Sequence, residues 1–185
     1  MSTSETLIFP SLQGEEIPAG SRPLLEKVLK SFGFIPNLYA AFSNSPVLLE
    51  GYIALDAVFS KGTLSHAERQ LVLLAASVVN ECAYCAAAHS TVAKHMLKVP
   101  AAVVAAVRTG QPVADAKLDA LVNLTRELVL SRGRVATATM ESFLNAGYRN
   151  DQIGGLLIGV ALKTISNYTD HLSPVEIDGA FKAEA

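Results

Sequence analysis

The sequence predicts an all-α protein, and three observations lead to this conclusion. Apolar residues recur three and four positions apart over most of the chain, which is the spacing of one helix face. Glycine and proline stand at short intervals between these segments, as is typical of short helix connections. No segment alternates apolar and polar residues between turn signals, as a half-buried strand would. We therefore expect a domain of about eight helices.

Start and stop signals place the helices along the chain. Ser21 precedes the first helix and Gly33 ends it, while Ser65 and Glu68 form a capping box at the start of an almost wholly apolar helix. That apolar helix should lie at the centre of the fold. Asn150 is the expected cap of the last helix. The predicted helical ranges are 23–30, 37–44, 47–60, 65–79, 82–97, 101–108, 115–130, 137–146 and 151–168.

A length of 185 residues suits one domain with a substantial core. Residues 1–20 contain several prolines and glycines with no sustained period, so they should form an N-terminal arm. Residues 21–173 should form the helical domain, and 174–185 a mobile C-terminal tail after Pro174. The four-residue spacing of Gly155 and Gly159 predicts close packing of the last helix against another.

The composition predicts an oligomer. Hydrophobic residues make up 50% of the chain and charged residues 17%, with a mean hydropathy of +0.33. This leaves little polar surface to cover a monomer, so part of the apolar surface should be buried between subunits.

Charge and hydropathy exclude other classes of partner. The net charge of −2 and the absence of a basic run argue against nucleic-acid binding. The first residues lack the features of a secretion signal, and the most apolar run, 153–162, is about half the length that a bilayer crossing needs. We expect a cytoplasmic protein that binds no membrane.

Both cysteines lie in one short segment, Glu81–His89, with the sequence ECAYCAAAH. On a helix, Cys82, Cys85 and His89 are spaced three and four apart and share one face. The two sulfurs then lie within roughly 5 Å along the helix axis, near enough to form a disulfide after a small adjustment. A helix N-terminus, an imidazole and a second thiol can each favour the reactive thiolate. This pattern predicts a redox-active pair with His89 as its base; which cysteine attacks first stays open.

The cysteines have two other interpretations. Free cysteines are often small buried core residues, but a spaced pair beside a histidine favours redox chemistry. A zinc site is less favoured, because His95 lies about 20 Å from Cys82 along one helix. Zinc would have to take ligands from His66 or His171, so we expect no metal and no other cofactor.

Neighbouring residues have both structural and catalytic interpretations. Tyr84 is either an aromatic packing residue or a proton relay between His89 and a carboxylate. Glu81 and Glu68 compete for the role of that carboxylate, although Glu68 is also the partner of Ser65 in the capping box. The sequence does not decide between them.

The segment Leu64–His95 resembles the core motif of the AhpD-like proteins of the carboxymuconolactone decarboxylase superfamily. The likeness rests on the sequence around Glu68, the apolar helix after it, Asn80 and the Cys-x-Tyr-Cys motif followed by His89. A looser resemblance, which includes 163–171, extends over most of the chain.

The resemblance implies an all-helical fold that assembles as homotrimers or homohexamers. It implies that Cys82 and Cys85 are the redox pair, that His89 is the motif histidine and that Tyr84 holds a position occupied by His or Tyr. The family relay includes a glutamate where this chain has Gln70, and an amide cannot take a proton near neutral pH. Glu68 or Glu81 would then have to replace it.

These considerations predict a thiol-dependent peroxidase of the alkylhydroperoxidase type. It would reduce a small hydroperoxide with the Cys82–Cys85 pair, assisted by His89, and an external dithiol would reset the disulfide. One alternative is a disulfide reductase or electron-transfer adaptor for a separate peroxidase. Another is a non-enzymatic, redox-sensing oligomer.

Overall fold

The computed structural model describes residues 8–185, and in this part of the chain the all-α prediction is confirmed. Nine α-helices are connected by short turns, and no strand occurs among the described residues. Residues 1–7 of the expected N-terminal arm lie outside the described part. The helices are α1 (Arg22–Phe32), α2 (Asn37–Phe42), α3 (Pro46–Ser60), α4 (His66–Val79), α5 (Ala83–Thr91), α6 (Ala101–Arg108), α7 (Ala116–Leu130), α8 (Thr137–Asn145) and α9 (Asn150–Leu172).

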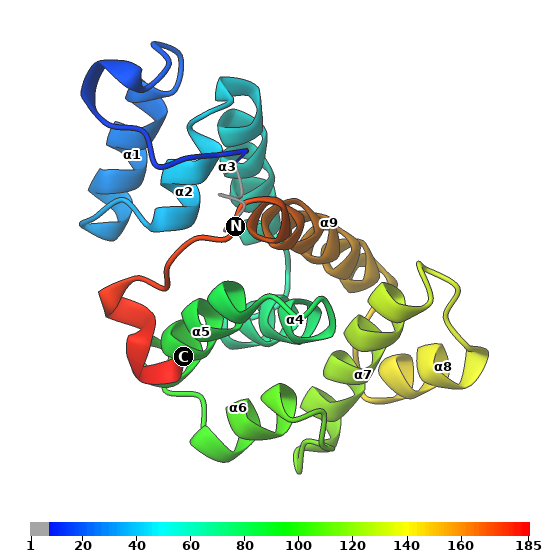
Figure 1. Cartoon of the computed structure of the whole chain (residues 1–185). Helices are drawn as coiled ribbons and strands as arrows, with labels where there is room; N and C mark the ends of the chain where they lie inside the picture. Colours follow the sequence, from blue (N-terminus) through cyan, green and yellow to red (C-terminus); the bar gives the residue numbers. More distant parts are fainter. Residues whose placement is uncertain (1–7) are drawn as a thin grey trace, which may run out of the picture.

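Helix α4 lies in the middle of the fold, as its apolar sequence predicts. It contacts α5, α6, α7 and α9 (Figure 1), and residues 71–77 are all buried. The Ser65–Glu68 capping box starts the helix: the Ser65 amide donates to Glu68 Oε2 at 2.7 Å, and the Glu68 amide donates to Ser65 Oγ at 3.2 Å. The capping prediction is therefore confirmed.

Helix α9 is longer than predicted and begins differently. Arg149, rather than Asn150, is the N-cap, and its amide donates to Gln152 Oε1 at 2.9 Å. The helix continues to Leu172, four residues beyond the predicted end at Tyr168. Among its residues after Val160, the polar Lys163, Ser166 and Asp170 are buried, which explains why the apolar pattern alone ended the helix too early.

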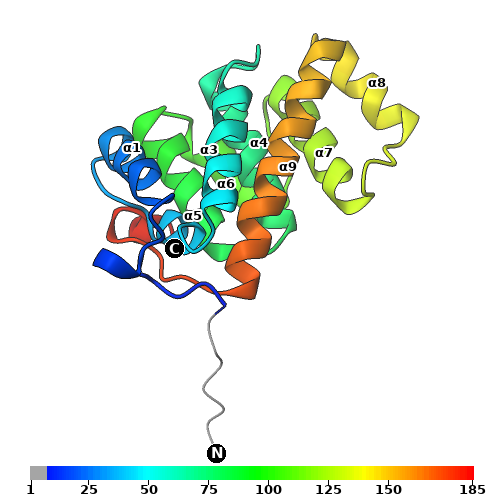
Figure 2. The same cartoon turned by 90° about the horizontal axis from the view of Figure 1, so that it is seen from above.

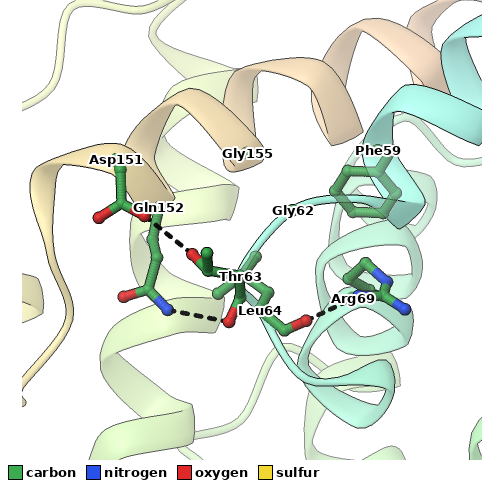
Figure 3. A pocket seen from close by; sticks show the side chains of 8 residues that line it. All are labelled: Phe59, Gly62, Thr63, Leu64, Arg69, Asp151, Gln152 and Gly155. Atoms are coloured by element: carbon green, nitrogen blue, oxygen red, sulfur yellow. Dashed lines mark hydrogen bonds between the residues drawn. The ribbon is translucent and has the colours of Figure 1, made fainter.

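The loop between α3 and α4 is tied to the start of α9 (Figure 3). Thr63 Oγ1 donates to Asp151 Oδ2 at 2.9 Å, and Arg69 donates to the Leu64 carbonyl at 2.7 Å. These residues line a small cavity of about 110 Å³. No cysteine or histidine lines this cavity, so the candidate reactive groups lie elsewhere.

The C-terminal tail is packed, whereas the sequence predicted that it would be mobile. A 3₁₀ helix, Gly179–Glu184, lies against α5 (Figure 1). The Phe181 ring stands edge-on to Tyr84 with 6.1 Å between ring centroids, and Glu184 Oε1 pairs with Lys94 at 2.6 Å. An aromatic contact and an ion pair, both formed with distant residues, hold a segment whose own sequence shows no helix pattern.

Helices α3 and α9 lie side by side (Figure 2), and a glycine makes their close contact possible. A Cβ atom built on Gly159 would stand 2.9 Å from Val72 Cγ1 of α4 and 3.0 Å from Phe59 Cε2 of α3. The predicted close packing of α9 is thus confirmed at Gly159.

Gly159→Leu should lower the free energy of unfolding by about 2 kcal/mol or more, because the new side chain has no space beside Val72 and Phe59. Gly154→Leu is the matched control on the same helix, where a Cβ meets no atom within 4 Å. It should leave stability unchanged or slightly raised, since leucine favours helix more than glycine does. Urea denaturation of both variants provides the test, and equal stabilities would contradict it.

Candidate functional site

A cavity of about 550 Å³ lies between α1–α5, α9 and the C-terminal tail. Cys85, His89, Gln70 and Lys163 line it, but Cys82 does not. Much of the remaining wall is aromatic and comes from elements far apart in the sequence. The aromatic lining residues are Phe32, Phe34, Tyr39, Tyr52, Phe59, Tyr84 and Phe181.

A tight turn places the cysteines at the start of a helix. Glu81 adopts a left-handed conformation with φ of 58°, which separates α4 from α5. Cys82 is the N-cap of α5, and its sulfur accepts a hydrogen bond from the Cys85 amide at 3.3 Å. The prediction of one helix over 82–97 needs correction, because α5 ends at Thr91 and a π-helical turn, Val92–Met96, follows.

Both cysteines are reduced and buried, with exposed fractions of 1% for Cys82 and 2% for Cys85. Their surroundings differ. Cys82 Sγ donates to Asp170 Oδ2 at 3.3 Å, while Cys85 Sγ lies 3.8 Å from Ser166 Oγ. Cys85 therefore faces the cavity with a hydroxyl beside it, and Cys82 stands behind it against a carboxylate.

Three pairs of side chains join α5 to α9. Lys163 Nζ lies 2.8 Å from His89 Nε2, Ser166 faces Cys85, and Asp170 faces Cys82. The two series run in opposite directions along their helices. Because each helix presents residues three and four apart on one face, antiparallel packing brings all three pairs into register.

His89 is held as a neutral imidazole. Its Nδ1 lies 2.9 Å from Gln70 Oε1 and its Nε2 contacts the Lys163 ammonium, a group that can only donate. Nε2 is therefore the acceptor, and Nδ1–H donates to the Gln70 carbonyl. Burial, followed by the positive charge of Lys163, lowers the pKa of His89 well below its usual value.

Lys163 is the principal positive charge of the site. Lys163 is only 1% exposed, so its ammonium is removed from bulk solvent. Asp56 lines the same cavity; burial raises the pKa of this carboxyl, while Lys163 and Arg69 act in the opposite direction. A buried cation of this kind favours an anion nearby.

The environment makes Cys85 the thiolate of the pair. The hydrogen bond with Cys82 lowers the pKa of Cys85 to about 6, and Lys163 and Ser166 act in the same direction against burial. The pKa of Cys82 is raised by its hydrogen bond with Cys85, by burial and by the negative charges of Cys85 and Asp170. These opposite shifts favour the thiolate on Cys85 and the thiol on Cys82.

The structure brings Cys82, Cys85, His89 and Gln70 together but places the other predicted relay residues elsewhere. The Tyr84 hydroxyl donates to Asp178 Oδ2 of the tail at 2.6 Å, not to His89. Glu68 is occupied by its capping box and by the Tyr148 hydroxyl at 2.9 Å, and it does not line the cavity. Glu81 is exposed in the turn.

The remaining histidines do not join the cysteines. His95 Nε2 pairs with Glu184 at 3.0 Å, His171 is exposed beside Tyr168, and His66 lies at the cavity wall in the first turn of α4. Within residues 8–185, no group of three or more His, Cys, Asp or Glu side chains is arranged to hold a metal ion. None of the helices in this range is long and apolar enough to cross a membrane.

Sequence reasoning missed three residues of the site: Lys163, Ser166 and Asp170. Each comes from α9, more than seventy positions after its partner on α5. A signal was present, because these polar residues recur three and four apart, which is the spacing of one helix face. Such a face becomes informative only once its partner helix is known.

The arrangement of helices is shared with several solved structures, an AhpD core among them. The chain matches the crystal structure of an AhpD-core, uncharacterized peroxidase-related protein from Ralstonia eutropha JMP134 with a TM-score of 0.81 and 21% identity, over 94% of this chain and 93% of that one. An uncharacterized peroxidase-related protein from Silicibacter sp. TM1040 matches with a TM-score of 0.79 and 15% identity, over 99% of both chains. The debrominase Bmp8, in its apo form, matches with a TM-score of 0.79 and 17% identity, over 98% of this chain and 97% of that one.

Residues 48–127 match the model of the carboxymuconolactone decarboxylase family. This match, over fewer than half of the residues, and the shared fold both support the resemblance found in the sequence. No curated protein matches the chain in sequence.

Lys163→Met should raise the pKa of Cys85 by about one to three pH units, because it removes the cation that favours the thiolate. The pH dependence of Cys85 alkylation by iodoacetamide, followed by mass spectrometry, measures this pKa. Lys94→Met is the matched control, since Lys94 pairs with Glu184 instead. An unchanged Cys85 profile in Lys163→Met would contradict the electrostatic role of Lys163.

The lowered pKa of His89 makes folding stability depend on pH. Below the ordinary value of 6.5, the unfolded imidazole binds a proton that the folded one does not, so stability falls as the pH falls. The slope from this one group is about 1.4 kcal/mol per pH unit. In His89→Gln the loss of stability between pH 7.5 and pH 5 should be smaller than in the wild type.

Urea denaturation at the two pH values measures this difference. His171→Gln, at an exposed position, should keep the wild-type pH dependence. The same slope in all three proteins would show that His89 is not held neutral.

Proposed function

We propose that the protein is a thiol-dependent peroxidase of the alkylhydroperoxidase type, in which Cys85 attacks the peroxide and Cys82 resolves the product. The observation that carries this proposal is the asymmetry of the pair. Cys85 lines a cavity of about 550 Å³ and has a pKa lowered to about 6. Cys82 is buried behind it and stays protonated.

In the first step, the Cys85 thiolate attacks the terminal oxygen of the hydroperoxide. A sulfur–oxygen bond forms, the oxygen–oxygen bond breaks, and the products are a Cys85 sulfenic acid and an alkoxide. The alkoxide takes a proton from Lys163, which lines the same cavity. His89, held neutral with its Nε2 toward Lys163, orients this donor, so His89 acts through Lys163 rather than as a base for the cysteine.

In the second step, the Cys82 sulfur attacks Cys85. The Cys82–Cys85 disulfide forms and the sulfenic oxygen leaves as water. An external dithiol then reduces the disulfide by exchange and restores both thiols. The cysteines supply two electrons to one hydroperoxide in each cycle, and no further cofactor is needed.

The cavity favours an organic hydroperoxide over hydrogen peroxide. Its volume exceeds what hydrogen peroxide requires, and its aromatic walls favour an apolar body. The polar groups, among them Gln70, His89 and Lys163, would face the peroxide group next to Cys85. We further propose that the protein acts in the cytoplasm as a homotrimer or homohexamer.

A second candidate function is reductive dehalogenation of an aromatic ring. One similar structure is a cysteine-to-alanine variant of Bmp8 in complex with 2,3,4-tribromopyrrole; it has 16% identity and a TM-score of 0.79 over 97% of this chain and 96% of that one. An aromatic-lined cavity that holds a thiolate favours this candidate. Replacing bromine by hydrogen would consume the same two electrons and give the same disulfide, with release of bromide.

Single-turnover oxidation tests the peroxidase proposal. The pre-reduced protein should consume cumene hydroperoxide rapidly and form the Cys82–Cys85 disulfide. Cys82→Ser should stop at a sulfenic acid on Cys85 that dimedone traps, whereas Cys85→Ser should lose rapid consumption by at least about a hundredfold, because its remaining thiol is buried and protonated. Stopped-flow spectroscopy and mass spectrometry measure these outcomes.

Other results identify the alternatives. Slow oxidation by peroxide with fast exchange against a protein or lipoyl disulfide would favour the disulfide reductase or electron-transfer adaptor. Bromide release from a bromopyrrole without peroxide turnover would favour dehalogenation. If the protein catalyses none of these reactions, the redox-sensing oligomer is the alternative that remains. A sulfenic acid trapped on Cys82 would reverse the assigned order of attack.

A further inference from the structure

The second step of the proposed cycle needs a base that the first step does not use. Cys82 must lose its proton to attack the Cys85 sulfenic acid. Yet Cys82 is only 1% exposed and does not line the cavity, so bulk water does not reach its sulfur to accept the proton. The acceptor must be a protein group in contact with Cys82.

Neither His89 nor Lys163 meets this requirement. His89 lies seven residues after Cys82, about 10 Å further along the helix axis. Its Nε2 already accepts from Lys163 and its Nδ1 faces Gln70. These two groups serve the opposite end of the cysteine pair.

Asp170 is a protein group in contact with Cys82 that can accept its proton. Its Oδ2 lies 3.3 Å from Cys82 Sγ, and its Oδ1 accepts a hydrogen bond from the Val175 amide at 3.2 Å. The residue is only 8% exposed. The backbone contact fixes one carboxylate oxygen and directs the other at the sulfur, in the geometry of a general base and its nucleophile.

We propose that Asp170 is the catalytic base of disulfide formation. As the Cys82 sulfur bonds to Cys85, its proton moves to Asp170 Oδ2. The bond between the Cys85 sulfur and the sulfenic oxygen breaks, and the leaving hydroxide takes a proton that solvent supplies through the cavity and departs as water. Reduction of the disulfide by the external dithiol returns the proton from Asp170 to Cys82. Of the two dithiol protons, one restores the Lys163 ammonium and the other goes to solvent.

The contact between Cys82 and Asp170 also explains why Cys82 does not lose its proton before the peroxide reacts. In the resting site, the negative charges of Cys85 and Asp170 both keep the proton on Cys82, and the thiol donates this proton to Asp170 Oδ2. Oxidation converts the Cys85 anion into a neutral sulfenic acid. One of the two negative charges that held the proton is then gone, so its transfer to Asp170 becomes easier only after the peroxide has reacted.

Asp170→Asn tests this inference, which rests on the proposed function. The amide oxygen can still accept from Val175, but an amide cannot take a proton near neutral pH. Stopped-flow oxidation should show an unslowed first phase, because Cys85 keeps Cys82, Lys163 and Ser166. The disulfide-forming phase should be about a hundredfold slower, and dimedone should trap a sulfenic acid on Cys85 that the wild type does not accumulate.

Glu176→Gln is the matched control, since it removes one carboxylate from the exposed tail close by and should leave both phases at the wild-type rate. A disulfide phase in Asp170→Asn as fast as in the wild type, or faster, would overturn the inference. The first phase reports that the variant is folded. If both phases are slower in Asp170→Asn, the rate of disulfide formation is measured in both proteins after the sulfenic acid has formed. An equal rate in the variant and the wild type also overturns the inference.

Failure of the peroxidase proposal can be distinguished from failure of the base assignment. If the wild-type protein does not react with hydroperoxide, diamide is used as the oxidant instead. The Cys85 thiolate adds to the azo nitrogen of diamide, and Cys82 then attacks Cys85 and displaces the hydrazine. The second step again requires loss of the Cys82 proton. A slower second step in Asp170→Asn supports the base assignment without the peroxidase, and an equal rate refutes it.

Discussion

The buried ammonium of Lys163 is the constraint on which the site depends. A cation with so little exposure to water costs several kcal/mol unless anions and hydrogen-bond acceptors surround it. The fold supplies His89 Nε2 as the acceptor and places Cys85 and Asp56 near enough for their charges to act on it. The thiolate form of Cys85 is thus favoured by the same interaction that makes the buried lysine tolerable, which ties the reactivity of the sulfur to the packing of α9 on α5.

The two sulfurs have different properties although they are only three residues apart. One lies inside the first turn of α5 and faces the cavity; the other caps the helix from outside and accepts the Cys85 amide. This difference arises at Glu81, whose left-handed backbone ends α4 and redirects the chain before Cys82. A continuous helix would have placed both thiols on one surface with similar neighbours, and the division between an anionic and a protonated cysteine would be lost.

Much of this architecture could be predicted from the sequence, because local signals determine it. The capping box of Ser65 and Glu68, and the spacing of Cys82, Cys85 and His89, each specify structure within a few residues. The interpretation of Glu68 as a capping residue was correct, while Tyr84 and Glu81 do not reach His89. The glycine spacing predicted that α9 packs closely against another helix, but not which side chains meet there. The contacts of Lys163, Ser166 and Asp170, and those of the tail, depend on how segments distant in the sequence pack.

The C-terminal tail forms a part of the cavity wall that is separate from the helices carrying the reactive groups. Ala180 and Phe181 belong to the wall, whereas Cys85, His89 and Lys163 are carried by the helix pair beneath. Asp178 joins this wall to Tyr84 and to the first amide of α2, so three short segments share one anchor. Variation in a dozen terminal residues can therefore reshape which molecules enter, while the electrostatics around the sulfurs stay intact, and new selectivity can evolve without a loss of chemistry.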